Sequence, residues 1–315
     1  MWGVEFGKNM NKPLLSIVVP TRGPVEDFWF SQLLKVRGDA DIILVYPPGA
    51  QPREVQDGRV RQFVAPLRGE VIQRLSGLFN AQGEYVLSFN CDECVHPDIA
   101  HLVQGYFKRF PESWALRLKW DRDIEFKGEL DWRDMPDINR MEVLRKGDDL
   151  RAYSEGRAII EVPIAPLDKW FNPLLLIQFY PRKDHHGLHM ENFDHRVWRN
   201  SLVQEAIREL KDCFNMAGPF KWMPFWALDT LLGLFIQAKF FKKGIVIGHW
   251  LPAPAQVVDI DFRHKRGFRL YLLANMLALR KYARYGYLWN WVVAGFWEEA
   301  RIHLGAFKRR IKRIV

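Results

Sequence analysis

Short apolar runs rich in β-branched residues alternate with helix-patterned segments over the first 110 residues, and this alternation restricts the chain to few folds. The strand-like runs are residues 14–19, which are almost continuously apolar, and residues 41–46, 60–65 and 84–89. The segments with apolar residues three and four positions apart are 25–37, 69–81 and 98–110. We expect strands at the former and helices at the latter. Strands that alternate with helices pair in parallel, so the pattern predicts an α/β fold built from βαβ units.

The carboxyl ends of these strands are the expected ligand site, because open α/β sheets bind ligands beyond those ends. In this sequence the ends are Pro20–Pro24, Tyr46–Gly49 and Asn90–Cys94. The rest of the chain has a less regular pattern. From it we expect a strand at 114–120, loops and short elements over 121–157, a helix toward the end of 191–211, a helix at 226–243, a strand at 243–248 and an extended segment over 252–262.

The positive charge of the chain is concentrated at its C-terminal end. The net charge is +9, yet residues 262–315 alone hold 13 Lys and Arg against two acids, Glu298 and Glu299. The remaining chain is therefore close to neutral. A nucleic-acid binder would spread basic residues through its body, and no RNP-like or zinc-finger signature occurs, so we expect no nucleic-acid partner.

The basic segment also carries an apolar stripe with helical spacing. Its residues are Trp297, Ala300, Leu304, Phe307, Ile311 and Ile314, preceded by a group of aromatics between Tyr285 and Trp297. Such a helix is typical of interfacial segments and predicts contact with an anionic membrane surface. The alternative is a helix that packs on the protein body and leaves its basic face solvated.

Membrane-spanning and targeting segments are not expected. No stretch reaches the ~18 uninterrupted apolar residues that a spanning helix needs, and the N-terminus lacks the apolar core of a signal peptide. Three cysteines are too few for a disulfide framework and favour a reducing compartment. We therefore expect a cytoplasmic protein that is peripheral on the inner face of the membrane.

Four motifs occur in order along the first third of the chain. They are Ser16–Arg22, Gln73–Leu78, Ala81–Tyr85 and Asn90–Glu93. In this order and spacing they resemble the motifs of family-2 glycosyltransferases of the GT-A fold. Farther along, Asp229 falls where these enzymes carry a general base, although Leu228 replaces the usual acid before it.

The resemblance implies a GT-A, Rossmann-like fold with a mixed, mainly parallel sheet flanked by helices and a C-terminal amphipathic helical extension. It implies a nucleotide-sugar-binding half at 12–113 and an acceptor and catalytic half at 114–261. The basic aromatic helices at 262–315 would then be a membrane-surface anchor. The implied activity is hexosyltransferase-like: a sugar moves from a nucleotide-sugar donor to a glycan or lipid-linked acceptor.

The resemblance also assigns roles to residues. Asp92 would bind Mn²⁺ or Mg²⁺ at the donor diphosphate, with His249 as a second ligand. Asp229 would be the general base of an inverting reaction. The expected donor-binding residues are Pro20, Thr21, Arg22, Tyr46, Arg74, Asn90 and Asp92.

Each role has a structural alternative. Asp92 could cap a turn and Asp229 could cap a helix. Arg74 could pair with Glu70 one helical turn away, and His249 could pack beneath Trp250.

Two departures from the family pattern favour an alternative function. Tyr46 stands where the family has an acid that contacts the nucleotide base, so the base would instead stack on this ring. Asn90 replaces the first acid of the metal motif. The alternative is a degenerate, non-catalytic GT-A homologue that binds a glycan or a partner.

Four of the nine histidines lie in the segment 184–195. A solvated polar loop is the favoured interpretation, followed by a loop that touches the acceptor or the donor phosphates. A zinc site with His185 and His189 is the least favoured.

Overall fold

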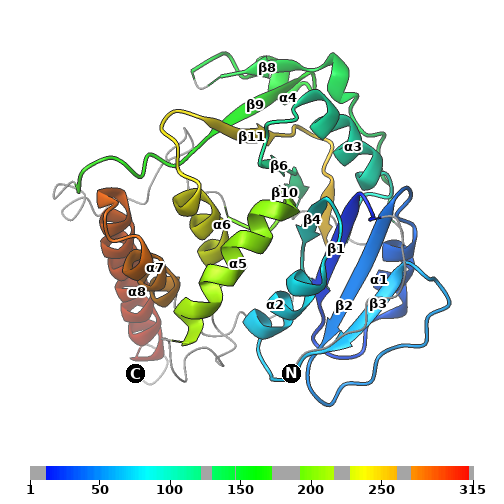
Figure 1. Cartoon of the computed structure of the whole chain (residues 1–315), viewed down its shortest axis with the longest axis horizontal. Helices are drawn as coiled ribbons and strands as arrows, with labels where there is room; N and C mark the ends of the chain where they lie inside the picture. Colours follow the sequence, from blue (N-terminus) through cyan, green and yellow to red (C-terminus); the bar gives the residue numbers. More distant parts are fainter. Residues whose placement is uncertain are drawn as a thin grey trace.

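The computed structural model describes residues 12–121, 130–145, 147–171, 192–215, 228–260 and 271–311. Within these residues the chain folds around a nine-stranded sheet (Figure 1). In order across the sheet the strands are β3 (Val60–Val64), β2 (Ala40–Tyr46), β1 (Leu15–Pro20), β4 (Tyr85–Ser88), β10 (Arg196–Arg199), β6 (Ala115–Arg117), β11 (Val246–Trp250), β9 (Ala158–Pro163) and β8 (Glu142–Leu144). A smaller sheet joins β5 (Glu93–Val95), β12 (Val257–Asp259) and β7 (Trp120–Asp121).

The large sheet is parallel in its first part and mixed beyond it. β3, β2, β1 and β4 pair in parallel. β10 runs antiparallel between β4 and β6. β11 is parallel to β6 and antiparallel to β9. Every residue of β1 is buried, as expected of a parallel strand covered on both faces.

Helices cover the two faces of the sheet and bury two apolar clusters. One cluster holds residues of α1 (Asp27–Leu34) and α3 (Ile99–Arg109). The other holds residues of α2 (Glu70–Asn80), α5 (Asn200–Asn215), α6 (Leu228–Lys239), α7 (Tyr271–Lys281) and α8 (Gly286–Ile311). The short α4 (Arg151–Ser154) and the 3₁₀ turn η1 (Ile138–Arg140) lie in the irregular middle of the chain.

Gly77 shows why the second sequence motif has a glycine. A Cβ atom at this position would collide with the side chain of Val18 and lie 3.0 Å from Val45. The missing side chain lets α2 approach β1 and β2 closely, which brings the polar first turns of α2 to the strand ends.

The alternating strands and helices predicted for the first 110 residues are confirmed, as are α6 and β11. Two strands of the large sheet are not predicted by the pattern. β10 is four residues long with an arginine at each end, so only Val197 and Trp198 mark it as apolar. β9 is interrupted by Glu161. Both are set by their pairing with neighbours rather than by their own sequence.

The strand expected at 114–120 divides into two pieces that join different sheets. β6 pairs with β10 and β11, whereas β7 pairs with β12. Strands from the segments 12–113 and 114–261 therefore lie in one large sheet.

The C-terminal extension consists of two helices. α7 packs beside α6, and α8 packs beside α7 (Figure 1). Among the described residues, no helix is both long enough and apolar enough to cross a membrane.

Candidate active site

The loops after β1 and β4 meet the residues that precede β10. Because β10 is antiparallel to β4, with Val197 opposite Leu87, Asp194 and His195 come close to the end of β4. α6 joins the same place: the backbone N–H of Phe193 donates to the carbonyl of Asp229, at 2.9 Å. The topology thus brings Asp92 and Asp229, distant in sequence, to one edge of the sheet.

Asp92 forms the open part of this site. Its Oδ2 accepts a hydrogen bond from Arg22 at 2.7 Å, and the Arg22 side chain is 52% exposed. Its Oδ1 is buried and has no hydrogen-bond partner among the described residues. A buried carboxylate oxygen without a partner is costly, and a cation would satisfy it.

The residues present fit a divalent cation that is held mostly by substrate. In the described part of the chain, no group of three or more His, Cys, Asp or Glu could hold a metal. Mg²⁺ commonly binds through one or two carboxylates together with substrate phosphates and water. Asp92 alone matches such a site, and it does not match a closed, all-protein metal cage.

Arg74 forms the closed part of the site. Its side chain is 1% exposed. Nη2 donates to Asn90 Oδ1 at 2.6 Å, and Nη1 donates to Ser88 Oγ at 3.1 Å and to Asp194. Burial lowers the pKa of Arg74, but the carboxylates of Asp194, Glu70, Asp229 and Glu93 outweigh it and hold the pKa above its usual value.

Asp194 is a buried acid that shares its surroundings with Asp229. Burial raises the pKa of Asp194 to about 7; Arg74 opposes this rise, and the negative charge of Asp229 adds to it. The guanidinium of Arg74 contacts Asp194 directly and also interacts electrostatically with Asp229.

Glu93 and His195 hold the loop that follows β4. Glu93 Oε1 lies 2.7 Å from His195 Nε2, and Oε2 accepts from the backbone N–H of Asn90 at 2.7 Å. The His195 ring stacks on Trp120, with centroids 4.9 Å apart. Burial raises the pKa of Glu93, but the interactions with His195 outweigh it, so the pKa lies below its usual value. Asn90 is therefore fixed from two sides, by Arg74 and by Glu93.

Two of the predicted donor-binding residues shape the loop after β1. Pro20 and Thr21 are buried. Thr21 Oγ1 donates to the carbonyl of Val45 at 3.3 Å, and its own carbonyl accepts from Gln73 Nε2 at 2.7 Å. These bonds order the loop that presents Arg22.

The predictions for Tyr46 and Arg74 need correction. The Tyr46 side chain is fully buried, and its hydroxyl donates to Gln62 Oε1 at 2.8 Å, so the ring cannot stack on a nucleotide base. Arg74 was expected at the donor phosphates, but its guanidinium is enclosed by protein groups. The alternative pairing with Glu70 is present at 3.4 Å.

His249 is also corrected, because the structure does not bring it to Asp92. Its Nδ1 lies 2.8 Å from the hydroxyl of Tyr106, in the C-terminal half of α3, and its ring packs on Phe110, which directly follows that helix. Asp92 precedes the N-terminus of that helix. Burial lowers the pKa of His249 to about 4, which keeps the ring neutral. We leave His249 out of the candidate metal site.

Sequence reasoning missed the roles of Asp194 and His195. The available signal was an acid and a histidine directly before a short apolar pair, Val197 and Trp198, but this signal depends on recognising β10. His185 and His189 lie outside the described residues.

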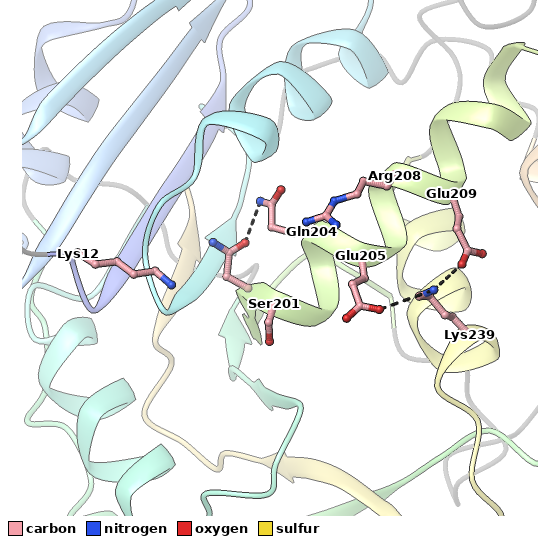
Figure 2. A pocket seen from close by; sticks show the side chains of 8 residues that line it. Lys12, Ser201, Gln204, Glu205, Arg208, Glu209 and Lys239 are labelled. Atoms are coloured by element: carbon pink, nitrogen blue, oxygen red, sulfur yellow. Dashed lines mark hydrogen bonds and ion pairs between the residues drawn. The ribbon is translucent and has the colours of Figure 1, made fainter. Parts of the chain in front are cut away.

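A separate hollow of about 560 Å³ lies along α5, and Figure 2 shows side chains that line it. Lys239 pairs there with Glu209 and, at 3.7 Å, with Glu205, while Lys12 and Arg208 add two more cations. None of the described residues that line it is a predicted site residue. Its acids already have a lysine partner, so we place the candidate active site at the strand ends instead.

Comparison with known proteins identifies the fold. No protein-family profile matches the sequence, and no curated protein matches it significantly. A crystal structure of S. aureus TarS 1-349 in complex with UDP-GlcNAc is similar over 85% of this chain and 66% of the TarS chain, with a TM-score of 0.50 and 13% identity. The same TarS fragment in complex with UDP matches over 85% and 64%, with a TM-score of 0.46 and 14% identity.

The chain thus spans slightly less than two thirds of these TarS chains. At such low identity the likeness concerns the fold, and it rests on the first of the two structures. The protein has the GT-A fold that the motifs of its first third predict.

Proposed function

We propose that the protein is a family-2 glycosyltransferase that moves a sugar from a nucleotide-sugar donor to a hydroxyl of a glycan or lipid-linked acceptor. The observation that carries the proposal is Asp92: one oxygen pairs with exposed Arg22, and the other is buried without a partner at the end of β4. The similarity to TarS, which binds UDP-GlcNAc in its crystal structure, supports a nucleotide-sugar as the donor.

The donor side of the reaction falls to the loops after β1 and β4. Asp92 would hold Mn²⁺ or Mg²⁺ through Oδ1; when bound, the cation neutralises the negative charge that develops on the diphosphate leaving group. Arg22, half exposed and adjacent, would pair with a phosphate oxygen. Asn90, fixed by Arg74 and Glu93, would accept a hydrogen bond from the donor.

Asp229 would act on the acceptor side. As general base it takes the proton from the acceptor hydroxyl while that oxygen attacks the sugar, which gives inversion at the anomeric carbon. Asp194 and Arg74 lie beside it and set its electrostatic surroundings. They would position this carboxylate but would not contact substrate, since Arg74 is enclosed by protein.

The setting belongs to the same proposal: a cytoplasmic enzyme, peripheral on the inner face of a membrane, with an anionic membrane surface as a partner. Lipid-linked acceptors are presented at such a surface. The support is the basic C-terminal segment and the exposed aromatic side chains of α8.

A second candidate is a non-catalytic GT-A homologue that binds a glycan or a partner. It is favoured by the burial of Tyr46 and the enclosure of Arg74, which remove two expected donor contacts. The two candidates differ in turnover: the homologue would bind a nucleotide or glycan without releasing nucleoside diphosphate.

The experiment measures the melting temperature with UDP, GDP or CDP, each with and without Mn²⁺, and then the release of nucleoside diphosphate from the matching sugar donor. A nucleotide at 100 times its Kd should stabilise the protein by about 2.7 kcal/mol, and only with Mn²⁺. We expect Asp92→Ala to lose this shift. Asp229→Asn should keep it but lower turnover by about 10² to 10⁴.

Asp98→Ala is the matched control, because Asp98 also pairs with an exposed arginine, Arg37. The control should keep both the shift and the turnover. A shift that survives in Asp92→Ala would overturn the donor site, and full turnover in Asp229→Asn would overturn the base. Binding without turnover in the wild type would select the non-catalytic homologue.

A further inference from the structure

α8 is held to the protein by one of its faces. Tyr287, Leu288 and Glu299 are buried there. Glu299 Oε1 accepts from the backbone N–H of Leu272 at 2.6 Å, which satisfies a free donor at the start of α7. Trp291 Nε1 donates to Asn275 Oδ1 at 2.8 Å. These contacts fix how the helix is rotated about its axis.

The opposite face of α8 presents large apolar side chains to solvent. Trp289, Phe296, Trp297 and Leu304 are 44%, 52%, 46% and 61% exposed. Trp289 and Phe296, and likewise Trp297 and Leu304, are seven residues apart, which is about two turns, so each pair forms a row along the helix. The two rows are about 100° apart around the axis and together form one broad stripe. Single exposed apolar residues are ordinary, but a continuous stripe marks an interaction surface.

Two further exposed apolar side chains belong to segments that pack against α8. Trp170 is 91% exposed, and the backbone of residues 169–171 packs against Gly286, the first residue of α8. In addition, Met276 of α7 is 51% exposed. Apolar side chains are therefore accessible from the first turn of α8 to beyond its middle.

Charge selects among the partners that could cover the stripe. Arg301 is exposed, and the last turns of α8 carry Lys308, Arg309 and Arg310 in sequence. Of the two acids in residues 262–315, Glu299 is already bonded to α7. A second copy of this chain would bring two strongly basic segments together, which costs free energy. An anionic surface would instead be attracted by them.

We propose that this exposed face of α8 docks on an anionic lipid surface. Phe296 and Trp297 enter the boundary between headgroups and acyl chains, and the basic residues of the last turns contact the anionic headgroups. The proposed function locates the protein at a membrane, and the exposed face of α8 is the surface that would make this contact. Its docking rests on the proposed function only for the side of the membrane that is used. Lipid binding and sugar transfer can fail independently.

The test is co-sedimentation of the full chain with vesicles of phosphatidylcholine alone or mixed with phosphatidylglycerol. We expect binding to the anionic vesicles only, weakened by added NaCl. Phe296→Glu with Trp297→Glu, and separately Lys308→Glu with Arg309→Glu and Arg310→Glu, should each weaken binding by on the order of tenfold or more.

Phe79→Glu is the matched control, because Phe79 of α2 is 47% exposed and lies outside the stripe. It should bind vesicles like the wild type. Phe79, Phe296 and Trp297 are exposed, and unchanged melting temperatures would show that all of the variants fold.

Three outcomes would overturn the proposal. The first is no binding to anionic vesicles, or equal binding to neutral ones. The second is a dimer in sedimentation velocity that the Phe296→Glu, Trp297→Glu variant dissociates, since the stripe would then be a protein interface. The third is binding to RNA that both the double and the triple variant lose, while their binding to vesicles is unchanged. Loss of nucleotide-dependent stabilisation would concern the proposed function only.

Discussion

Asp92 and Arg74 lie at the same edge of the sheet, yet their surroundings differ sharply. Arg74 is enclosed and donates to Asn90, Ser88 and Asp194. Asp92 has an exposed arginine on one oxygen and no described partner on the other. Arg74 is arranged like a structural centre, because both of its terminal nitrogens bond to protein groups and only its buried Nε has no hydrogen-bond partner among the described residues. Asp92 is incomplete without a ligand, which is expected of a binding group.

This contrast shows how a fold can keep a ligand-binding carboxylate available while the residues around it are fixed. A buried, unpaired carboxylate oxygen is tolerated only where neighbouring groups are strongly fixed. Arg74 and Glu93 supply that fixation by holding Asn90, two residues before Asp92. The strong interactions at this edge of the sheet therefore fix Asn90, whereas Asp92 stays available to the substrate.

Arg74→Met should produce the largest loss of stability. It would leave Asp194 buried without its cation and Asn90 without its donor, at a cost of about 3–5 kcal/mol. Urea unfolding at neutral pH measures this cost. A loss below about 1 kcal/mol would show that the closed centre does not support the fold.

We expect the titration of Asp194 to cause a pH dependence of the free energy of unfolding. Its folded pKa of about 7 lies above the ordinary 3.8, so between these values the folded protein holds a proton that the unfolded chain has released. Its contribution is complete below about pH 4 and is lost as the pH rises to about 7, with a slope of at most about 1.4 kcal/mol per pH unit.

Asp194→Asn should remove that slope, because the amide resembles the protonated acid and does not titrate. Urea midpoints of the wild type and the variant, compared between pH 4 and pH 8, provide the measurement. Glu93 works in the opposite direction at low pH, since its pKa is lowered, so Glu93→Gln serves as the control. An unchanged slope in Asp194→Asn would contradict the assignment.

The fold was predictable because its first part is local in sequence. β1, β2 and β4 are short, largely apolar strands, and Gly77 and Gly83 lie within family-like motifs. β10 was not predictable, because two apolar residues flanked by arginines become a strand only through pairing with β4 and β6. Tertiary pairing overrides local propensity in such short strands.

The candidate site was predictable in part. The motifs locate Arg22, Asn90 and Asp92 at one edge, since strand ends are readable from sequence. They could not reveal that Arg74 turns inward, because that depends on Asp194, which is 120 residues away in the chain. Burial likewise explains why the roles predicted for Tyr46 and His249 need correction. Each side chain faces apolar residues from elements that are distant in the sequence.

Tyr46→Phe tests one of these corrections. Removing the hydroxyl breaks its bond to Gln62, at a cost of about 1 kcal/mol. Gln62 Oε1 keeps the backbone N–H of Arg53 as a donor, at 3.1 Å, so no acceptor is orphaned. The nucleotide-dependent rise in melting temperature should be unchanged. A diminished rise would place Tyr46 at the nucleotide after all.

Arg22→Met should have the smallest effect on the fold. The side chain is half exposed, and solvent can replace it on Asp92 Oδ2, so the loss of stability should stay below about 1 kcal/mol. Its effect should instead be seen in weaker binding of the nucleoside diphosphate, measured by titration in the presence of Mn²⁺. A stability loss close to that of Arg74→Met would make the Arg22–Asp92 pair structural, and the distinction between an open and a closed half of the site would then disappear.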